Sequence, residues 1–228
     1  MPEEKQDRWR GPGQSIFDKP ERVYTSFYIT RAIAQFTARA LGRVEVLGKE
    51  NIPKNGPIIL ASNHRSMVDP PYMTFALDRM PYYMGKDELY HNKLIGTYFM
   101  SLGSFPVKRG APDRAALRFA IDLLKNGRIL GIFPEGTREV DNKLIPAEKG
   151  FAMIAKQTNA PIVPVALEGT EKVFPKGAKA LRRGDVSINI GKPVTAQEIL
   201  ASRGVSGKES LEVIGEEVMS RIAALMRK

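Results

Sequence analysis

The stretch PIILASNHRSMVDPP, residues 57–71, joins a short apolar run to a polar bend and ends on two prolines. The apolar run, residues 57–61, has the length and composition of a buried strand. Pro70 and Pro71 are expected to stop regular structure and to favour an extended backbone at the residue before them. His64 and Asp69 lie between, so the stretch places an imidazole and a carboxylate at one strand end.

The spacing of His64 and Asp69 predicts a bend between them. In a strand, residues five apart point to opposite faces, and in a helix they point roughly 140° apart. The two side chains therefore meet only if the backbone turns. Asp69 would then orient the imidazole, whose second nitrogen would exchange a proton with a substrate. A surface histidine beside a turn aspartate is the alternative that this pair alone leaves open.

The composition fits one folded domain with an excess of positive charge. The chain has 228 residues, of which 43% are hydrophobic, enough for a single sizeable core. Lys and Arg number 35 against 25 Asp and Glu, giving a net charge of +10. Such a charge favours anionic lipid, phosphorylated substrates or an acidic carrier protein as partners. Since no nucleic-acid-binding motif is recognisable, no nucleic-acid partner is expected.

Several classes of site are excluded or disfavoured by residue usage. The chain has no cysteine, which excludes disulfides, thiolate zinc sites and a cysteine-bound acyl intermediate. His91 is the only histidine besides His64, so no metal site is expected. The N-terminus lacks the apolar centre of a signal peptide, and no stretch approaches the roughly 20 apolar residues of a spanning helix.

The N-terminal residues divide into a tail and a helix. Residues 1–21 are charged and rich in Gly and Pro, which predicts a flexible tail. Residues 22–42 are predicted to form an amphipathic helix, because Ile29, Ile33 and Phe36 recur at helical spacing. Two interpretations are open: a helix that faces the protein core, or a membrane-facing helix that lies in the lipid headgroup layer.

Residues 43–228 alternate between strand and helix patterns. Strands are predicted at 43–47, 57–61, 82–84, 129–133, 162–167 and 186–190. Helices are predicted at 72–77, 93–102, 112–124, 150–158 and 210–226, with a further short one opened by the capping box of Thr195 and Glu198. This alternation predicts an α/β fold: a single domain with a central mixed or largely parallel sheet flanked by helices.

Two polar stretches follow predicted strands. GSFPVKRG, residues 103–110, ends in Lys108 and Arg109, which suit a phosphate as a point charge and a guanidinium fork. FPEGTR, residues 133–138, directly follows a buried strand. A solvated basic turn and a structural Glu–Arg pair are the respective alternatives.

Within residues 133–138, each side chain suggests a different contact. Gly136 allows close approach of the backbone to a ligand. Thr137 and Arg138 offer a hydroxyl and a guanidinium to phosphate oxygens. Glu135 would repel a phosphate, so we expect it to accept a hydrogen bond from a substrate hydroxyl or to hold a basic neighbour.

Together these stretches resemble the glycerolipid acyltransferase family, most closely its bacterial 1-acyl-glycerol-3-phosphate (lysophosphatidic acid) acyltransferases. The first block of that family, His-x4-Asp, is matched by His64 and Asp69, and its third, FPEGTR, by residues 133–138. A Pro-containing apolar strand, residues 162–165, matches the fourth. The second block, near residues 103–109, departs from the commonest form, because Lys108 stands where Asp or Asn usually precedes the arginine.

The resemblance implies transfer of a fatty acyl group to the 2-hydroxyl of lysophosphatidate, giving phosphatidate in phospholipid biosynthesis. It implies His64 as general base oriented by Asp69, and a substrate-binding set of Lys108, Arg109, Glu135, Gly136, Thr137 and Arg138. Backbone N–H groups of the bend or Lys108 would stabilise the oxyanion. Acyl-coenzyme A or acyl carrier protein would be the co-substrate, with no bound cofactor and no metal.

The expected location is the cytoplasmic face of the cell membrane, bound peripherally or monotopically to anionic lipid. Two alternatives remain open. One is an enzyme of the same family that acylates glycerol-3-phosphate or another lysophospholipid. The other is a basic module that binds anionic lipid without catalysis.

Overall fold

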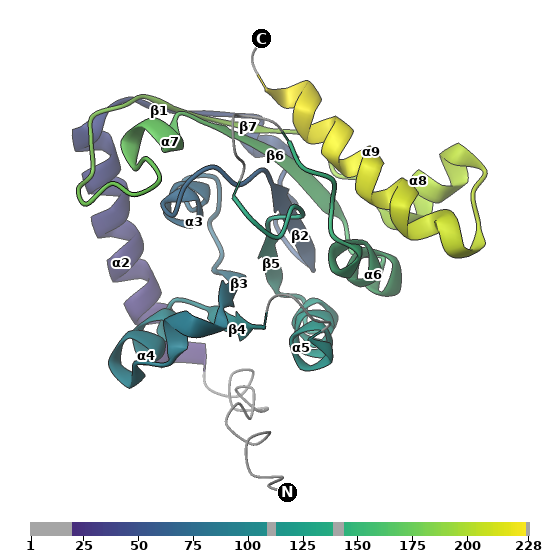
Figure 1. The fold of residues 1–228 in the computed structure, drawn as a ribbon, viewed down its shortest axis with the longest axis horizontal. Coiled ribbons are helices and arrows are strands. Elements are labelled where there is room, and N and C mark those ends of the chain that lie inside the picture. The colour runs from purple at the N-terminus through teal and green to yellow at the C-terminus, as the bar shows by residue number, and fades with distance from the viewer. Residues whose placement is uncertain (1–19, 109–112, 139–143, 227–228) are drawn as a thin grey trace, which may run out of the picture.

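Seven strands form one sheet with helices on both of its faces in the computed structural model, which describes residues 20–108, 113–138 and 144–226 (Figure 1). The strands are β1 Val44–Leu47, β2 Ile58–Ser62, β3 Pro81–Lys86, β4 Ser104–Val107, β5 Ile129–Ile132, β6 Ile162–Glu168 and β7 Val186–Ile190. The predicted α/β class with a single domain is confirmed.

The strand order is β1-β7-β6-β2-β5-β3-β4. Every neighbouring pair is parallel except β6 and β7, so the predicted largely parallel sheet is confirmed. β2 is central, because Ala61 pairs in register with Ile132 of β5 and with Pro164 of β6. The parallel strands β2, β5, β3 and β4 are consecutive, so their carboxyl ends lie along one edge, where ligands bind in open α/β sheets.

The predicted helices are present to within a few residues, and one short helix, Thr170–Val173, was not predicted. The helices are α2 Pro20–Leu41, α3 Asp69–Met73, α4 Lys93–Ser101, α5 Arg114–Lys125, α6 Lys149–Thr158, α7 Thr170–Val173, α8 Ala196–Arg203 and α9 Ser210–Leu225, with 3₁₀ turns η1 Lys49–Asn51, η2 Asp87–Tyr90 and η3 Gly207–Glu209. Helices α5, α6 and α9 cover one face of the sheet, and α2, α3 and α7 lie on the other (Figure 1). The predicted capping box of Thr195 and Glu198 is present at the start of α8.

The core lies on both sides of β2. Ile59 and Ala61 point into the cluster under α5, α6 and α9, while Ile58 and Leu60 point into the cluster under α3. All four are buried. A strand covered on both faces has no solvent side, which explains why its sequence is a continuous apolar run rather than an alternating one.

The prediction that Pro70 and Pro71 stop regular structure is wrong. Helix α3 begins at Asp69, three residues before the predicted start, and both prolines lie in its first turn. Proline is tolerated there because the first N–H groups of a helix have no partner within the helix, and its fixed φ already suits the helix. Asp69 is thus the first residue of a helix and not part of an extended segment.

Helix α2 begins at Pro20, two residues before the predicted start. The predicted tail, residues 1–21, otherwise lies outside the described residues.

Across the part of the chain that the structure describes, we find no helix that combines the length and apolarity needed to span a membrane.

Candidate active site

Asn63 anchors the end of the central strand. Its side chain is fully buried, with Nδ2 donating to the carbonyl of Leu167 over 3.0 Å and Oδ1 accepting from the N–H of Leu167 over 2.8 Å. The amide therefore mimics one more rung of backbone pairing between β2 and β6. This fixes the point at which the chain leaves the sheet, one residue before His64.

The predicted bend after β2 brings His64 and Asp69 into contact. Nδ1 of His64 lies 2.7 Å from Oδ2 of Asp69, and the same oxygen accepts the N–H groups of Arg65 and Ser66, each over 2.8 Å. A carboxylate oxygen can only accept hydrogen bonds, so each of its three neighbours must be a donor. The two backbone N–H groups are donors, and Nδ1 of His64 must therefore carry the imidazole proton. The lone pair is then on Nε2, the nitrogen that faces away from Asp69.

Burial distinguishes the two members of this pair. The Asp69 side chain is completely buried, whereas 14% of the His64 side chain remains exposed. A buried carboxylate is stable only when hydrogen-bonded, which the two backbone N–H groups and the imidazole provide. The hydroxyl of Ser66 donates to the carbonyl of Phe174 over 2.8 Å and ties the bend to the chain beyond β6. The pair therefore presents only an imidazole edge to a substrate.

An aromatic stack supports the imidazole. The ring of Phe133 lies 4.0 Å from that of His64 at an interplanar angle of 17°, and the ring of Tyr83 follows 6.2 Å from Phe133 at the same angle. Tyr83 pairs in register with Gly131, and a Cβ at Gly131 would overlap the Tyr83 ring. Burial, with a smaller contribution from the charge of Asp69, raises the pKa of Tyr83, so its hydroxyl stays protonated.

The sequence predicted a strand at residues 82–84 but not that the ring of Tyr83 stacks beside Phe133. The stack forms because β3 lies beside β5 in the sheet. The order of strands in a sheet cannot be predicted from a local sequence pattern, so the stack could not be predicted either. Lys86 was also missed: it ends β3, is in register with Val107, and forms an ion pair with Glu88 at 2.9 Å. The signal for Lys86 was available, because it is a cation just past a predicted strand, like Lys108.

Glu135 joins the third sequence block to the first. It is 2% exposed, and its Oε1 and Oε2 accept the N–H groups of His64 (3.1 Å) and Ile145 (3.0 Å). The expected hydrogen bond to a substrate hydroxyl stays a prediction, and the observed contacts favour a positioning role. Because the N–H groups of residues 64–66 all donate to carboxylates, they are not available to an oxyanion.

The other described residues of the predicted set lie along the same edge of the sheet. Gly136 and Thr137 are exposed and Arg138 is half-buried just past β5, and Lys108 is exposed just past β4. Gly136 has a φ of +66°, a conformation that favours glycine. Arg109 lies outside the described residues. Since β4 is three strand positions from β2, Lys108 begins about 14 Å from the strand that leads into His64.

The cations at this edge differ in their surroundings. Neither Lys108 nor Arg138 forms an ion pair with another described residue, whereas Lys86 is paired. Among the described residues, no group of three or more His, Asp or Glu side chains is arranged to hold a metal ion. The chemistry that this edge supports directly is therefore proton transfer at His64 beside a positively charged surface.

Comparison with known proteins agrees with these features. A family model described as Acyltransferase matches residues 43–168. The 1-acyl-sn-glycerol-3-phosphate acyltransferase of Bacillus subtilis is 34% identical over 190 residues, covering 82% of this chain and 90% of that protein. The protein of the same name from Streptococcus pneumoniae is 31% identical over 170 residues, covering 73% of this chain and 60% of its own length.

A solved structure has the same fold. The crystal structure of the 1-acyl-sn-glycerophosphate (LPA) acyltransferase PlsC from Thermotoga maritima superposes with a TM-score of 0.67 at 32% identity, covering 94% of this chain and 87% of that one. The matched residues of the family model include His64, Asp69 and the stretch 133–138. The resemblance seen in the sequence is confirmed, and the chain belongs to the acyltransferase family.

Proposed function

We propose that this protein transfers a fatty acyl group from a coenzyme A or acyl carrier protein thioester to the 2-hydroxyl of 1-acylglycerol-3-phosphate, giving phosphatidate. The observation that carries the proposal is the contact between His64 and Asp69 at the carboxyl edge of the sheet, in a chain whose relatives are named for that reaction. The contact leaves Nε2 of His64 free to accept the proton of an alcohol.

The proposed step balances without a covalent enzyme intermediate. Nε2 of His64 takes the hydroxyl proton as the acceptor oxygen bonds to the thioester carbonyl carbon, forming a tetrahedral oxyanion. The carbon–sulfur bond then breaks, and the imidazolium returns the proton to the leaving thiolate. Asp69 keeps Nδ1 protonated and stabilises the imidazolium. Since the N–H groups of residues 64–66 are occupied, the predicted oxyanion donors that remain are the other N–H groups of the bend and Lys108.

The acceptor phosphate is proposed to lie between the ends of β5 and β4. Arg138 and Arg109 would bind its oxygens through their guanidinium groups, and Gly136 and Thr137 would let the backbone and a hydroxyl approach it. The absence of an ion pair between Arg138 and another described residue supports this placement, because such a pair would have to be broken first.

The orientation of α2 supports contact with a membrane. Ile29, Ile33 and Phe36 are 58%, 62% and 77% exposed, while Phe27 and Ala38 are buried. The polar Gln35 contacts the domain through the carbonyl of Thr74. The apolar face thus points away from the core, which favours the membrane-facing interpretation of residues 22–42. We propose peripheral or monotopic binding at the cytoplasmic face of the cell membrane.

The proposal is tested with purified protein, acyl-coenzyme A or acyl carrier protein, and a panel of acceptors, with products identified by mass spectrometry. The panel contains lysophosphatidate, glycerol-3-phosphate and lysophosphatidylcholine. We expect phosphatidate from lysophosphatidate and a loss on the order of 10²- to 10⁴-fold in His64→Ala, the range for a general base. Another preferred acceptor would support the same-family alternative. Activity retained in His64→Ala would refute the mechanism, and vesicle binding without any product would support the non-catalytic lipid-binding alternative.

A further inference from the structure

Helix α4 exposes a cluster of large apolar side chains. Leu94 is 84% exposed, Tyr98 50%, Ile95 47% and Met100 40%. Gly96 is the one buried residue of this helix, and it lies against the backbone of Tyr90. The helix therefore contacts the domain through its smallest residue and the half-buried Phe99, and turns its other large apolar residues outward. A cluster of this kind marks an interaction surface, unlike a single exposed apolar side chain.

Helix α4 lies beside α2. The two helices are in contact, and the hydroxyl of Ser26 donates to the carbonyl of Ser101 over 3.0 Å (Figure 1). Of the twelve large hydrophobic residues that are exposed among those described, eight belong to these two helices. We call the exposed apolar residues of both helices the α2–α4 surface.

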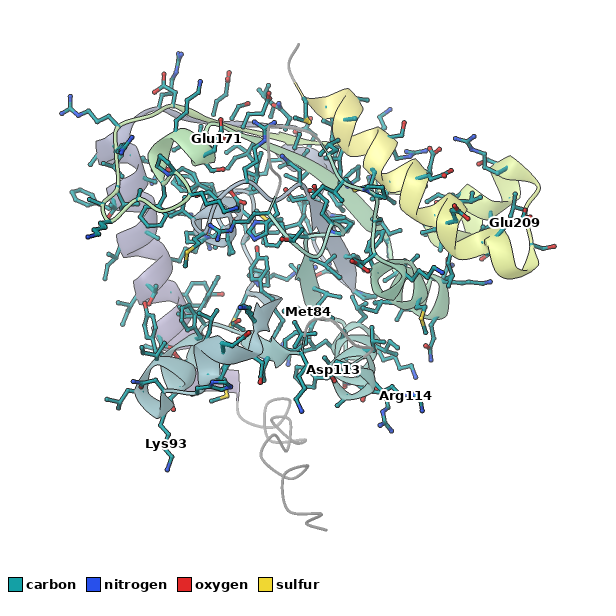
Figure 2. The ribbon with its side chains drawn as sticks, in the orientation of Figure 1. Met84, Lys93, Asp113, Arg114, Glu171 and Glu209 are labelled. Carbon is teal, nitrogen blue, oxygen red and sulfur yellow. The ribbon has the colours of Figure 1, made fainter. Side chains whose placement is uncertain are left out.

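The charges around this surface select its partner. Helix α4 contains no acidic residue, and residues 25–41 of α2 contain none but include Arg31 and Arg39. The two acidic residues of the turn before α4 each have a partner: Glu88 is ion-paired with Lys86, and Asp87 lies 3.4 Å from His91. Lys93 begins α4 and points outward in Figure 2. Apolar helices with basic and almost no acidic side chains match an anionic bilayer, where acyl chains take the apolar residues and headgroups the cations.

The topology relates this surface to the site. Helix α4 connects β3 to the parallel strand β4, so it runs back antiparallel to them from the carboxyl edge of the sheet. Its first turn, with Leu94 and Ile95, therefore lies at the edge that carries Lys86 and Lys108. This places the most exposed apolar residue of the described chain on the side from which a lipid acceptor would approach.

We propose that α4 is a second membrane-contacting helix, whose first turn enters an anionic bilayer at the edge of the sheet that holds the acyl-transfer site. The role of this contact rests on the proposed function: if the protein acylates a lipid, the bilayer would deliver that lipid acceptor at this edge. The experiments below measure only whether α4 contacts a membrane and do not require acyl transfer. A negative result for α4 would therefore leave the proposed activity untouched, and loss of the proposed activity would leave the membrane contact of α4 testable.

The first experiment measures partitioning onto vesicles of phosphatidylglycerol and phosphatidylcholine by co-sedimentation. Leu94→Ser with Ile95→Ser should weaken partitioning at least about 10-fold, because two large side chains lose apolar burial. Met153→Ser on α6 is the matched control, since Met153 is 44% exposed on another face of the molecule, and its partitioning should stay within about 2-fold of the parent. Parent-like partitioning of the α4 variant would overturn the proposal.

The second experiment measures the surroundings of single residues instead of the strength of membrane binding. Because the chain has no cysteine, one introduced cysteine can be labelled specifically. Leu94→Cys and Met153→Cys each create a unique site for a polarity-sensitive fluorophore. With anionic vesicles, emission from position 94 should shift to shorter wavelength, and emission from position 153 should not. A label at position 94 that stays in water while the protein sediments with vesicles would overturn the proposal. So would a shift that appears without vesicles as protein concentration rises, because a second copy would then cover the surface.

Discussion

The carboxylate of Glu135 accepts a hydrogen bond from the backbone N–H of His64 over 3.1 Å, although 71 residues separate the two in the chain. Its other oxygen accepts from Ile145, so one side chain joins the end of β2, the end of β5 and the segment before α6. Each of these N–H groups is satisfied by a charged acceptor in a buried position. The Phe-Pro-Glu-Gly-Thr-Arg stretch thus contributes to the geometry of the histidine as well as offering residues for substrate.

Glu135→Gln tests whether this residue positions the loop or binds substrate. The amide keeps one acceptor but turns a donor toward one backbone N–H, and leaving such a group unsatisfied costs about 1–3 kcal/mol. We expect the melting temperature to fall by roughly 2–12 °C at 2–4 °C per kcal/mol, together with kcat. Circular dichroism and steady-state kinetics check this. An unchanged melting temperature with a raised KM for the acceptor would instead support direct contact with the glycerol hydroxyl.

Asp69→Asn tests the role of the buried carboxylate. The amide has nearly the same shape but cannot stabilise an imidazolium, so we expect kcat to fall on the order of 10²- to 10⁴-fold. The double variant with His64→Ala should be no less active than His64→Ala alone, because residues that act as a unit are not additive. Independent, multiplicative losses in the double variant would contradict a shared role. Thermal melts of all three variants provide the folding control.

Gly131→Ala tests the aromatic stack. The added methyl would overlap the ring of Tyr83 and push the stack toward His64. We expect a destabilisation of about 1–3 kcal/mol, typical of overpacking, with a loss of kcat. Gly150→Ala in α6 is the matched control: its new Cβ would make an ordinary contact at 3.5 Å with Leu117, and a glycine replaced inside a helix is neutral or stabilising. Equal effects at both positions would argue against the stack.

Stability should decrease above pH 10 because burial raises the pKa of three tyrosines, Tyr72, Tyr83 and Tyr90. Burial raises the pKa of Tyr90 to about 12, with a smaller contribution from Asp87, and burial also raises the pKa of Tyr83. In the unfolded chain tyrosine titrates near 10, so above that pH the unfolded state holds fewer protons and the free energy of unfolding falls as pH rises. Below pH 10 the tyrosines are protonated in both states, so their contribution to the free energy of unfolding is fully present.

Thermal melts from pH 8 to pH 12 measure this dependence. Tyr90→Phe should flatten the slope between pH 10 and pH 12, even though it loses the hydrogen bond to Ser104 and melts lower throughout. The exposed Tyr98 supplies the control variant, Tyr98→Phe, which should keep the slope of the parent. A parent-like slope in Tyr90→Phe would show that other groups cause the alkaline loss.

The local elements could be predicted because their causes are local. Apolar periodicity, the capping box at Thr195 and the continuous apolar run of β2 each depend on residues only a few positions apart. The contact of His64 with Asp69 was predictable for a similar reason, since the spacing leaves a bend as the only way to join them. The misplaced start of α3 came from treating proline as a breaker, although at the first turn it is compatible with a helix.

The sequence by itself therefore determined the α/β class and the order of elements along the chain, and it offered the imidazole–carboxylate pair as a hypothesis that the structure bears out. Tertiary structure decided which strands are neighbours, and with that the Tyr83–Phe133–His64 stack and the contact of Glu135 with His64. It also decided that the Ile33 and Phe36 side of α2 faces outward. An amphipathic pattern defines two faces of a helix, but which face packs depends on the surfaces that the rest of the fold presents, and those arise only when distant segments meet.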